Sequence, residues 1–250
     1  MQHKANIISL GAGLQSTALC YMSEMGLIER ADYIVFSDTG AEPSWVYETL
    51  ERVKRDISIP IEIITHGNLE HDVLEKKRYS APPFYIETDS GGMPMRRQCT
   101  VDYKILPIRR WIKKNFSKCN LFIGISLDEA QRARFSQVRF IEHVYPLIDL
   151  RMTRQSCISF FETNNIQVPA KSSCYFCPYH NDFYWLKMKT DYPDLFEKAC
   201  DFDEKIRDRG QLIDGKKQYL HKSCKPLRQV EFKHERQHKL EFSCSGGCGI

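Results

Sequence analysis

The fold of this chain is decided by the stretch Ser9-Leu10-Gly11-Ala12-Gly13-Leu14-Gln15-Ser16-Thr17. It follows a short apolar run, residues 6–10, that is typical of a buried strand, and it opens a segment whose apolar spacing predicts a helix over residues 16–25. The glycines let the chain turn sharply and let an anion approach the main chain. Free N–H groups at the start of the helix, together with the helix dipole, attract such an anion. The stretch therefore predicts a phosphate site between a strand and a helix.

The loop differs from two common phosphate-binding motifs. It lacks the lysine of a Walker loop, and its glycine spacing does not give the Gly-x-Gly-x-x-Gly of dinucleotide-binding proteins. Ser9, Ser16 and Thr17 offer hydroxyl donors in addition to the main chain. The alternative interpretation of the loop is an ordinary tight turn between a strand and a helix.

Strand-like and helix-like segments alternate through the first half of the chain. The strands are expected at residues 7–10, 33–37, 61–64 and 121–125, and the helices at residues 16–25, 44–55 and 101–114. This alternation predicts a doubly wound, mostly parallel α/β sheet covered by helices. Ligands of such sheets bind at the carboxyl ends of the strands, where the first loop lies. Residues 78–98, rich in proline and glycine, are interpreted as a long mobile loop of the kind that serves as a substrate lid.

Length and composition describe a globular protein. The 250 residues suffice for one full domain with a smaller module attached. Because the composition changes after Asp149, we expect a nucleotide-binding domain over residues 1–150 and a smaller cysteine-rich, helical, metal-binding module over residues 151–250. No apolar run approaches the length that crosses a bilayer, and no signal peptide is apparent, so we expect a cytoplasmic protein without a membrane partner.

The charge of the chain suits an anionic substrate. The formal net charge of +4 is too small to indicate nucleic acid by itself. Basic residues are nevertheless clustered, although solvated helix faces explain most runs of this kind. The clusters are Arg96-Arg97, Arg109-Arg110 with Lys113-Lys114, and Lys216-Lys217.

Three further segments make the first loop specific. They are Ser37-Asp38-Thr39-Gly40, Cys99-Thr100-Val101-Asp102-Tyr103-Lys104, and Gly124-Ile125-Ser126-Leu127-Asp128-Glu129-Ala130-Gln131-Arg132. Together with the first loop, and in this order, they resemble the PP-loop superfamily of adenine nucleotide α-hydrolases over about residues 5 to 180. The resemblance is greatest to the phosphoadenosine phosphosulfate reductase branch of that superfamily.

The resemblance implies a PP-loop, Rossmann-like fold that binds an adenine nucleotide, either ATP or a sulfonucleotide, with Mg²⁺ as a further candidate. Lys104 and Arg132 would be catalytic contacts to phosphates or to developing negative charge, whereas Arg134 is interpreted as surface charge. Asp38 has a second interpretation, as a cap at the end of its strand. The nucleotide-binding residues that the resemblance implies are Ser9, Gly11, Gly13, Gln15, Ser16, Thr17, Ser37, Asp38, Thr39 and Gly124.

The chain departs from the pattern of the superfamily at two places. Gln15 stands where the ATP-using members commonly carry an acid, and Ser126-Leu127 replaces the arginine of the fourth segment. These departures bear on the nucleotide chemistry rather than on the fold.

Ten cysteines in a chain of this size, without an export signal, favour metal binding or thiol chemistry over disulfides. The Cys174-x-x-Cys177 spacing lets two thiolates face one metal. The resemblance to iron–sulfur members of the reductase branch adds Cys99 and implies a [4Fe–4S] cluster. Its fourth position is either open or filled from Cys248, Cys244 or Cys224. Zinc in a four-cysteine site and a metal-free buried pair are the alternatives.

The tail of the chain also carries chemistry. Cys248 lies in Ser245-Gly246-Gly247-Cys248-Gly249-Ile250, a short flexible segment that suits a swinging nucleophile, so Cys248 is a catalytic candidate as well as a metal ligand. The tail of the sulfonucleotide reductases reads Glu-Cys-Gly-x-His. Here Gly247 replaces the glutamate and the histidine is absent.

Three functions compete on this evidence. The first is ATP-dependent adenylation of a nucleoside or nucleic-acid carbonyl, forming AMP and pyrophosphate, with iron–sulfur-dependent transfer of sulfur from a donor. The second is reduction of adenylyl sulfate, or of its 3′-phosphate, with a thiol reductant and Cys248 as nucleophile. The third is a nucleotide-binding, metal-site module without turnover.

Overall fold

The computed structural model describes residues 4–76, 81–89, 91–209 and 216–232. They divide into two compact units that alternate along the chain. Unit 1 contains the described residues up to Asp38, with Ser44–His66 and Lys104–Ser172; unit 2 contains Thr39–Pro43, Gly67–Tyr103 and the described residues from Ser173 onward. The change of composition after residue 149 thus falls inside unit 1, and each unit combines segments from both halves of the sequence.

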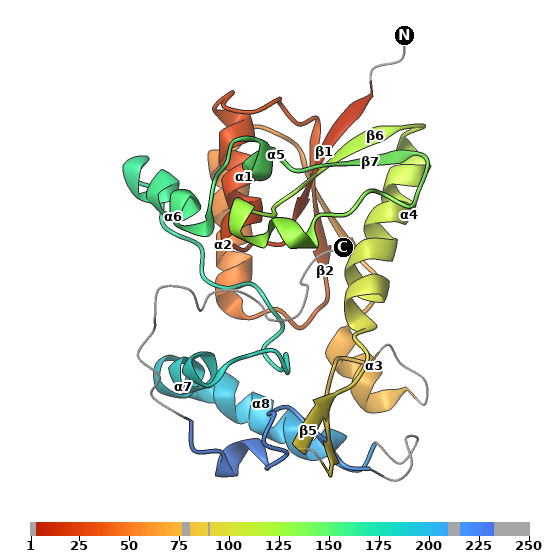
Figure 1. Ribbon diagram of the computed structural model, residues 1–250, viewed down its shortest axis with the longest axis vertical. Helices are drawn as coiled ribbons and strands as arrows, with labels where there is room; N and C mark the ends of the chain where they lie inside the picture. The colour runs from red at the N-terminus through yellow and green to blue at the C-terminus, as the bar shows by residue number, and fades with distance from the viewer. Residues whose placement is uncertain (1–3, 77–80, 90, 210–215, 233–250) are drawn as a thin grey trace. The chain divides into compact units, whose positions relative to one another are not determined.

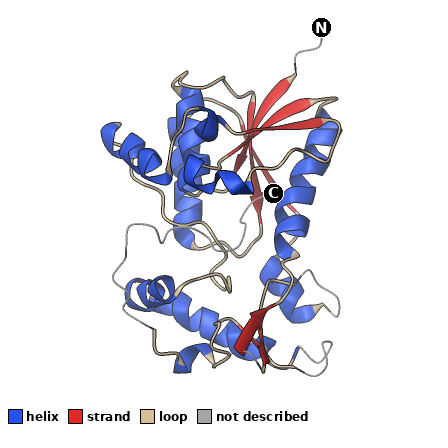
Figure 2. Ribbon diagram, in the orientation of Figure 1, coloured by secondary structure: helices blue, strands red, loops and turns tan. Residues whose placement is uncertain are grey.

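Unit 1 is built on a parallel sheet of five strands in the order β3-β2-β1-β6-β7. Figures 1 and 2 show α1 and α2 on one face of this sheet and α4 on the other. The doubly wound, parallel α/β architecture predicted from the sequence is therefore confirmed. The elements are β1 (Ala5–Leu10), α1 (Leu14–Glu24), β2 (Tyr33–Asp38), α2 (Ser44–Asp56), β3 (Ile61–Thr65), α4 (Leu106–Asn115), β6 (Cys119–Ile123), the 3-10 turn η2 (Leu127–Arg132), β7 (Ile141–Val144), α5 (Pro146–Asp149) and α6 (Arg154–Thr163).

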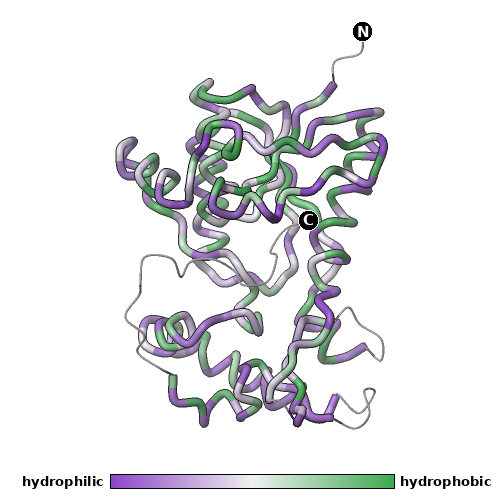
Figure 3. Tube along the Cα trace, viewed as in Figure 1, coloured by the Kyte–Doolittle hydropathy of each residue, from purple (hydrophilic) through white to green (hydrophobic). Residues whose placement is uncertain are grey.

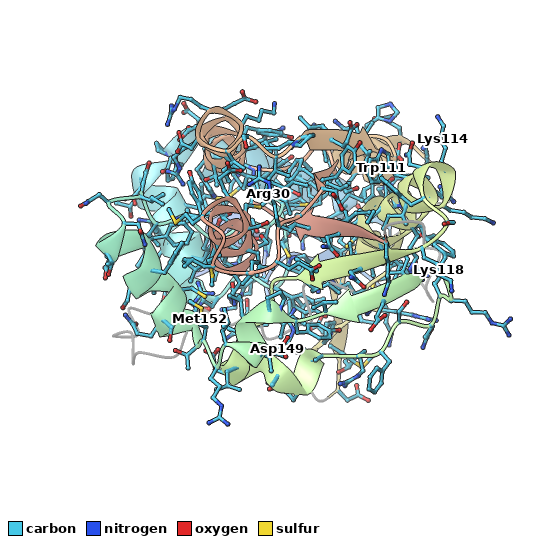
Figure 4. The ribbon with its side chains drawn as sticks, turned by 90° about the horizontal axis from the view of Figure 1, so that it is seen from above. Arg30, Trp111, Lys114, Lys118, Asp149 and Met152 are labelled. Atoms are coloured by element: carbon cyan, nitrogen blue, oxygen red, sulfur yellow. The ribbon has the colours of Figure 1, made fainter. Side chains whose placement is uncertain are left out.

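The central strands of the sheet, β1, β2 and β6, are buried on both faces, which is why they read as continuous apolar runs rather than as alternating ones. Ile7 and Ile8 of β1 point to opposite faces and are both fully buried. Each such side chain contributes about 1.5–3 kcal/mol to folding. Figure 3 shows the apolar character of these strands, and Figure 4 shows Trp111 of α4 and Met152, which precedes α6, on opposite sides of the sheet.

The order of the strands reverses between β1 and β6. At such a switch point the connections leave the sheet in opposite directions, which opens a crevice at the carboxyl ends of the two strands. The Gly11–Gly13 loop follows β1, and Gly124 follows β6. The predicted phosphate loop therefore lies where doubly wound proteins bind their ligands.

Unit 2 combines helices with a small antiparallel sheet in the order β5-β4-β8. Its core is aromatic: Phe176 stacks on Phe202 with ring centroids 3.9 Å apart, and Trp185 is fully buried. The turn of π-helix η1 runs across the boundary between the units. The elements are α3 (Leu69–Glu75), β4 (Tyr85–Thr88), β5 (Gly91–Pro94), η1 (Val101–Ile105), α7 (Asp182–Asp191), α8 (Pro193–Ile206), β8 (Gln218–Tyr219) and the 3-10 turn η4 (Leu227–Gln229).

The interpretation of residues 78–98 as a long mobile loop is wrong for the part that is described. β4 and β5 pair with Ile86 opposite Met93, and β4 also pairs with β8. The strand was hidden because β5 begins with two glycines. A Cβ at Gly92 would lie 2.1 Å from the carbonyl oxygen of Lys222, so a close approach of two backbones excludes a side chain there.

The helix predicted over residues 101–114 is interrupted. Residues 101–105 form the π-helical turn η1, and a regular helix begins only at Leu106, with Pro107 in its first turn. Proline has no N–H to continue the earlier ladder of hydrogen bonds, so α4 starts at that point. None of the helices in the described ranges has the length and apolar character needed to span a membrane.

Candidate nucleotide site and cysteine turn

The loop after β1 is folded around the hydroxyl of Ser16. The Oγ of Ser16 accepts the N–H of Gly11 at 3.1 Å and donates to the carbonyl of Gly13 at 3.3 Å. Between the two glycines, the buried Ala12 has a φ of +53°. An L-residue in this left-handed region costs about 1–2 kcal/mol. Strain of this kind is concentrated at functional sites, which favours a binding loop over an ordinary turn.

Gly124 brings the end of β6 against the first turn of α1. A Cβ at Gly124 would lie 2.6 Å from the backbone N of Ser16, 2.8 Å from its Cα and 2.9 Å from the carbonyl carbon of Gln15. Only glycine fits there, because all three atoms belong to the backbone. The first N–H groups of a helix have no partner within the helix, so this turn presents donors at the switch point. On the other side, Ser172 lies against the loop, since a Cβ at Gly13 would be 2.6 Å from its Oγ.

Gln15 lies at the centre of a chain of polar contacts that connects three segments of unit 1. Its Nε2 donates to Oε2 of the buried Glu129 at 2.9 Å, and Arg132 Nη1 forms an ion pair with Oε1 of the same carboxylate at 2.6 Å. On its other side, Gln15 Oε1 accepts from Arg154 Nη1 at 3.3 Å. Gln15 thus contacts Arg154 directly and is connected to Arg132 through Glu129. Arg132 was expected from the sequence, whereas Arg154 was not.

The sequence carries a local signal for the position of Arg154. Thr153 and Ser156 form a capping box, in which the Thr153 side chain accepts the N–H of Ser156 at 3.1 Å. The pattern starts α6 and makes Arg154 its first residue. The N–H of Arg154 donates to Asp128 Oδ1 at 3.1 Å, which ties the start of α6 to η2. Thr17 Oγ1, which is fully buried in α1, has no hydrogen-bond partner among the residues that the structure describes.

The residues at the end of β2 divide between the two units. Ser37 is buried, and the Asp38 carboxylate accepts the hydroxyl of Tyr47 from α2 at 2.9 Å. Thr39, the next residue, belongs to unit 2, where its Oγ1 donates to Glu42 Oε1 at 3.1 Å and lies 3.4 Å from the sulfur of Cys174. The hydroxyl expected at the adenosine is thus placed beside a predicted metal ligand. A nucleotide contact at Thr39 stays a prediction.

Cys174 and Cys177 share one tight turn. The N–H of Cys177 donates to the carbonyl of Cys174 at 2.9 Å, and the N–H of His180 donates to the carbonyl of Cys177 at 3.1 Å. The His180 ring returns to the turn, with Nε2 3.0 Å from the Cys174 carbonyl oxygen. His180 therefore serves to hold the cysteine turn, which has the geometry to present two sulfurs together.

The structure describes only part of the predicted ligand set. Within the four described ranges, no three Cys, His, Asp or Glu side chains are grouped so that they would hold a metal ion. Cys99 precedes η1, whereas Cys244 and Cys248 lie outside the described residues. The described side chains thus provide two thiols on one turn and do not, by themselves, fit a four-ligand cluster.

Cys224 and Cys177 of the turn act on the same tyrosine, Tyr85. The pKa of Tyr85 is raised, first by burial and then by the neighbouring groups Tyr179, Cys177 and Cys224. Cys224 itself has a left-handed φ of +51°, and burial raises the pKa of its thiol. Cys177 and Cys224 thus both influence the pKa of Tyr85, and a role of Cys224 as a further ligand stays a prediction.

Four other cysteines belong to the core. Burial raises the pKa of Cys119 to about 11 and the pKa of both Cys157 and Cys200 to about 12, and it raises the pKa of Cys20 as well. Thiols held in the protonated form are poor nucleophiles and poor metal ligands. These cysteines pack as small apolar side chains.

Two basic residues of the predicted site take separate positions. Lys104 is half-buried in η1, just before α4. Arg134 uses its guanidinium within its own loop, where Nη1 donates to the carbonyls of Gln131 at 2.6 Å and Ala133 at 2.8 Å. The interpretation of Arg134 as surface charge agrees with these contacts.

Comparison with known proteins returned matches among solved structures. No protein-family model matches the chain, and no curated protein matches it. The chain is similar to phosphoadenylyl-sulfate reductase from Candida auris, with 13% identity and a TM-score of 0.47 over 67% of this chain and 76% of that one. It is also similar to the U34-tRNA thiolase NcsA from Methanococcus maripaludis, solved with its [4Fe–4S] cluster, with 14% identity and a TM-score of 0.46 over 98% of this chain and 82% of that one.

With TM-scores below 0.5, these matches add no argument about the reaction. The fold of this chain is established by its own strand order and by the position of the Gly11–Gly13 loop at the switch point.

Proposed function

We propose that this chain is a PP-loop enzyme that binds ATP at the Gly11–Thr17 loop, adenylates a carbonyl oxygen of a nucleoside or nucleic acid, and directs sulfur to the activated carbon. The observation that carries the proposal is the strained loop at the switch point, closed by Gly124 against the first turn of α1. Backbone donors at a helix start, with two arginines nearby, suit the phosphates of a nucleotide.

The proposed reaction has two steps. The carbonyl oxygen attacks the α-phosphorus, and the bond from that phosphorus to the bridging oxygen breaks, so pyrophosphate leaves with the electron pair. A sulfur nucleophile from a donor then attacks the activated carbon, and AMP leaves with the C–O electron pair. The α1 N–H groups would hold the phosphates in line, and Lys104 and Arg132 would balance the charge that develops on pyrophosphate. Cys174 and Cys177 are proposed as two ligands of an iron–sulfur or zinc centre, with Cys99 and Cys248 as the others.

The test is nucleotide cleavage by protein purified without oxygen. Protein is incubated with ATP labelled at the α-phosphate and with RNA, DNA or nucleosides, and AMP and pyrophosphate are measured. We expect both products in equal amounts with at least one acceptor class. The variant Ser16→Ala should lose cleavage because Ser16 folds the loop, whereas Ser58→Ala, which removes a hydroxyl before β3, should retain it. Absence of cleavage with every acceptor would contradict the proposal.

The two competing functions give different results in the same assay. A reductase of adenylyl sulfate or of its 3′-phosphate would form sulfite with a thiol reductant, and Cys248→Ser would abolish all turnover. An adenylating enzyme would keep AMP formation in that variant. A binding module would retain nucleotide through long incubation without forming any product.

A further inference from the structure

We infer that the loop between η2 and β7 binds a single-stranded nucleic acid, with Phe135 stacking on one base and Arg134 and Arg139 attracting the phosphates. The inference rests on the proposed function and deepens it, because it makes the acceptor a polynucleotide strand rather than a free nucleoside. It starts from the side chain of Phe135, which is 99% exposed, more than any other large apolar side chain that the structure describes.

The backbone just before Phe135 is fixed by β7 and the residue that follows it. The N–H of Arg134 donates to the Tyr145 hydroxyl at 2.9 Å, and that hydroxyl donates to the Arg134 carbonyl at 2.6 Å. The same carbonyl accepts from Nδ1 of His143 at 3.0 Å. The ring of Phe135 is therefore held in solvent by a bonded backbone, and it is presented without the entropy cost of ordering a flexible loop.

The other apolar residues of the loop face the core. Val138 and Phe140 pack, partly buried, against a core cluster that includes residues of α4, β6 and β7. The Ser136 hydroxyl accepts the N–H of Val138 at 3.1 Å, which fixes the turn after Phe135. One outward ring offers little apolar area for inserting into a membrane or for seating a protein, but it matches the face of a single base.

The charge around Phe135 is positive. Residues 130–141 contain three arginines and no acidic residue. Arg132 is paired with Glu129, whereas Arg134 donates to main-chain carbonyls, which leave its positive charge in place, and Arg139 is exposed. Cations beside an exposed aromatic ring are typical of surfaces that bind single strands. A second copy of this chain would bring like charges together, which disfavours self-association through this loop.

The loop lies at the same edge of the sheet as the candidate nucleotide site. Tyr145 directly follows β7, so its two bonds hold Arg134 at the carboxyl end of that strand. β7 is the edge strand next to β6, as Figure 1 shows. Arg109 of α4 is close to β7, since its charge adds to the effect of burial in lowering the pKa of His143. A polynucleotide bound at Phe135 would thus reach the carboxyl edge where the loop after β1 lies.

The inference is tested by fluorescence anisotropy of the full chain with a labelled single strand of about 16 nucleotides, made as RNA and as DNA, and with the corresponding duplexes. We expect at least one single strand to bind more tightly than its duplex, because stacking needs unpaired base faces. Phe135→Ala should weaken the binding of that strand by about 5- to 150-fold, the loss expected for one base stack. Phe135→Trp, which keeps an aromatic face, should retain the binding.

The stacking contact and the phosphate contacts respond differently to salt. Arg139→Ala should reduce the slope of log K against log salt concentration by about 0.7, the value for one phosphate contact of a single strand. Phe135→Ala should leave that slope unchanged, because a stacked ring releases no counterion. The matched control is Leu27→Ala, which removes an exposed apolar side chain of the same unit outside this loop and should bind the strand like the wild type.

Failure of the inference and failure of the proposed function are distinguishable. If the folded Phe135→Ala protein binds the strand as tightly as the wild type, or if the wild type binds neither single strand, the inference is overturned, whereas cleavage of ATP with nucleosides would still support the proposed function. Binding to phosphatidylserine vesicles in place of the strands would also overturn it and would assign the loop to a membrane surface. Absence of ATP cleavage with every acceptor contradicts the proposed function, whatever the loop binds. Circular dichroism of each variant establishes that it is folded.

Discussion

The contact between Gly124 and the start of α1 allows a prediction with a worked magnitude. In Gly124→Ala the new Cβ would meet the Ser16 backbone N at 2.6 Å, whereas ordinary contacts begin at 3.4 Å. The two segments must therefore separate by about 0.8 Å, and because both are backbone, no side chain can rotate away. Overpacking of this kind costs about 1–3 kcal/mol. For a chain of this size, that cost lowers the melting temperature by about 2–12 °C.

The same displacement should weaken nucleotide binding. A shift of about 0.8 Å carries N–H donors of α1 beyond the distance of a good hydrogen bond, so the loss of one charge-assisted bond, about 1.5–3 kcal/mol, lowers the affinity for ATP at least about tenfold. The assays are thermal unfolding and calorimetric titration with ATP.

Gly26→Ala is the control for loss of stability alone. Gly26 has a φ of +71° with no atom within 4 Å of a new Cβ, so alanine costs about 1–2 kcal/mol in backbone strain at the far end of α1. It should lower the melting temperature and leave ATP affinity unchanged. If Gly124→Ala keeps the melting temperature and the ATP affinity of the wild type, Gly124 does not pack against the first turn of α1.

Three further predictions concern packing, protonation and the cysteine turn. Phe161→Ala should lower the free energy of unfolding, measured by urea titration, by about 3–5 kcal/mol because it empties a fully buried site. Phe160→Ala, at a half-buried position, should lower it clearly less. Equal losses in the two variants would contradict the packing of α6. Burial holds the pKa of His221 below its usual value near 6.5, although Asp182 acts in the opposite direction. As the pH falls, the unfolded chain therefore takes up a proton first, and the free energy of unfolding should decrease from pH 7 towards pH 5. This decrease should be smaller in His221→Gln, and an equal decrease in that variant would show that His221 is not its cause. Protein purified without oxygen should contain iron and acid-labile sulfide with visible absorption that Cys174→Ser removes; colourless protein with zinc would instead support the zinc alternative.

The fold was predictable because its signals are local. The central strands of the parallel sheet are buried on both faces, so β1 and β2 appear as short apolar runs, and the Gly11–Gly13 loop marks the transition from strand to helix. The elements that were missed are those where a distant contact overrides local preference. β5 contains Gly91-Gly92 because the backbone at Lys222 lies against it, more than a hundred residues further along the chain.

The candidate site was predicted in part for the same reason. Ser16 and Gly124 lie in motifs that a sequence displays, and they meet at the switch point. The contact of Arg154 with Gln15 joins residues that are 139 positions apart, and no spacing rule connects them. Thr39 is the opposite case: it follows Asp38 directly in the sequence but belongs to the other unit, where its hydroxyl lies beside the sulfur of Cys174. Neighbours in the sequence need not share a site.

The alternation of the two units has a consequence for how the protein is made. The chain passes between them five times, after Asp38, Pro43, His66, Tyr103 and Ser172. On the ribosome, unit 1 cannot complete its fold until the segment that ends at Ser172 has emerged. Residues Gly67–Tyr103 of unit 2 have been synthesised by then, but the segment of unit 2 that begins at Ser173 has not. Neither unit is one continuous fragment of the chain, so no single cut between Asp38 and Ser173 separates one complete unit from the other, and a fragment that ends in this range lacks part of both hydrophobic cores.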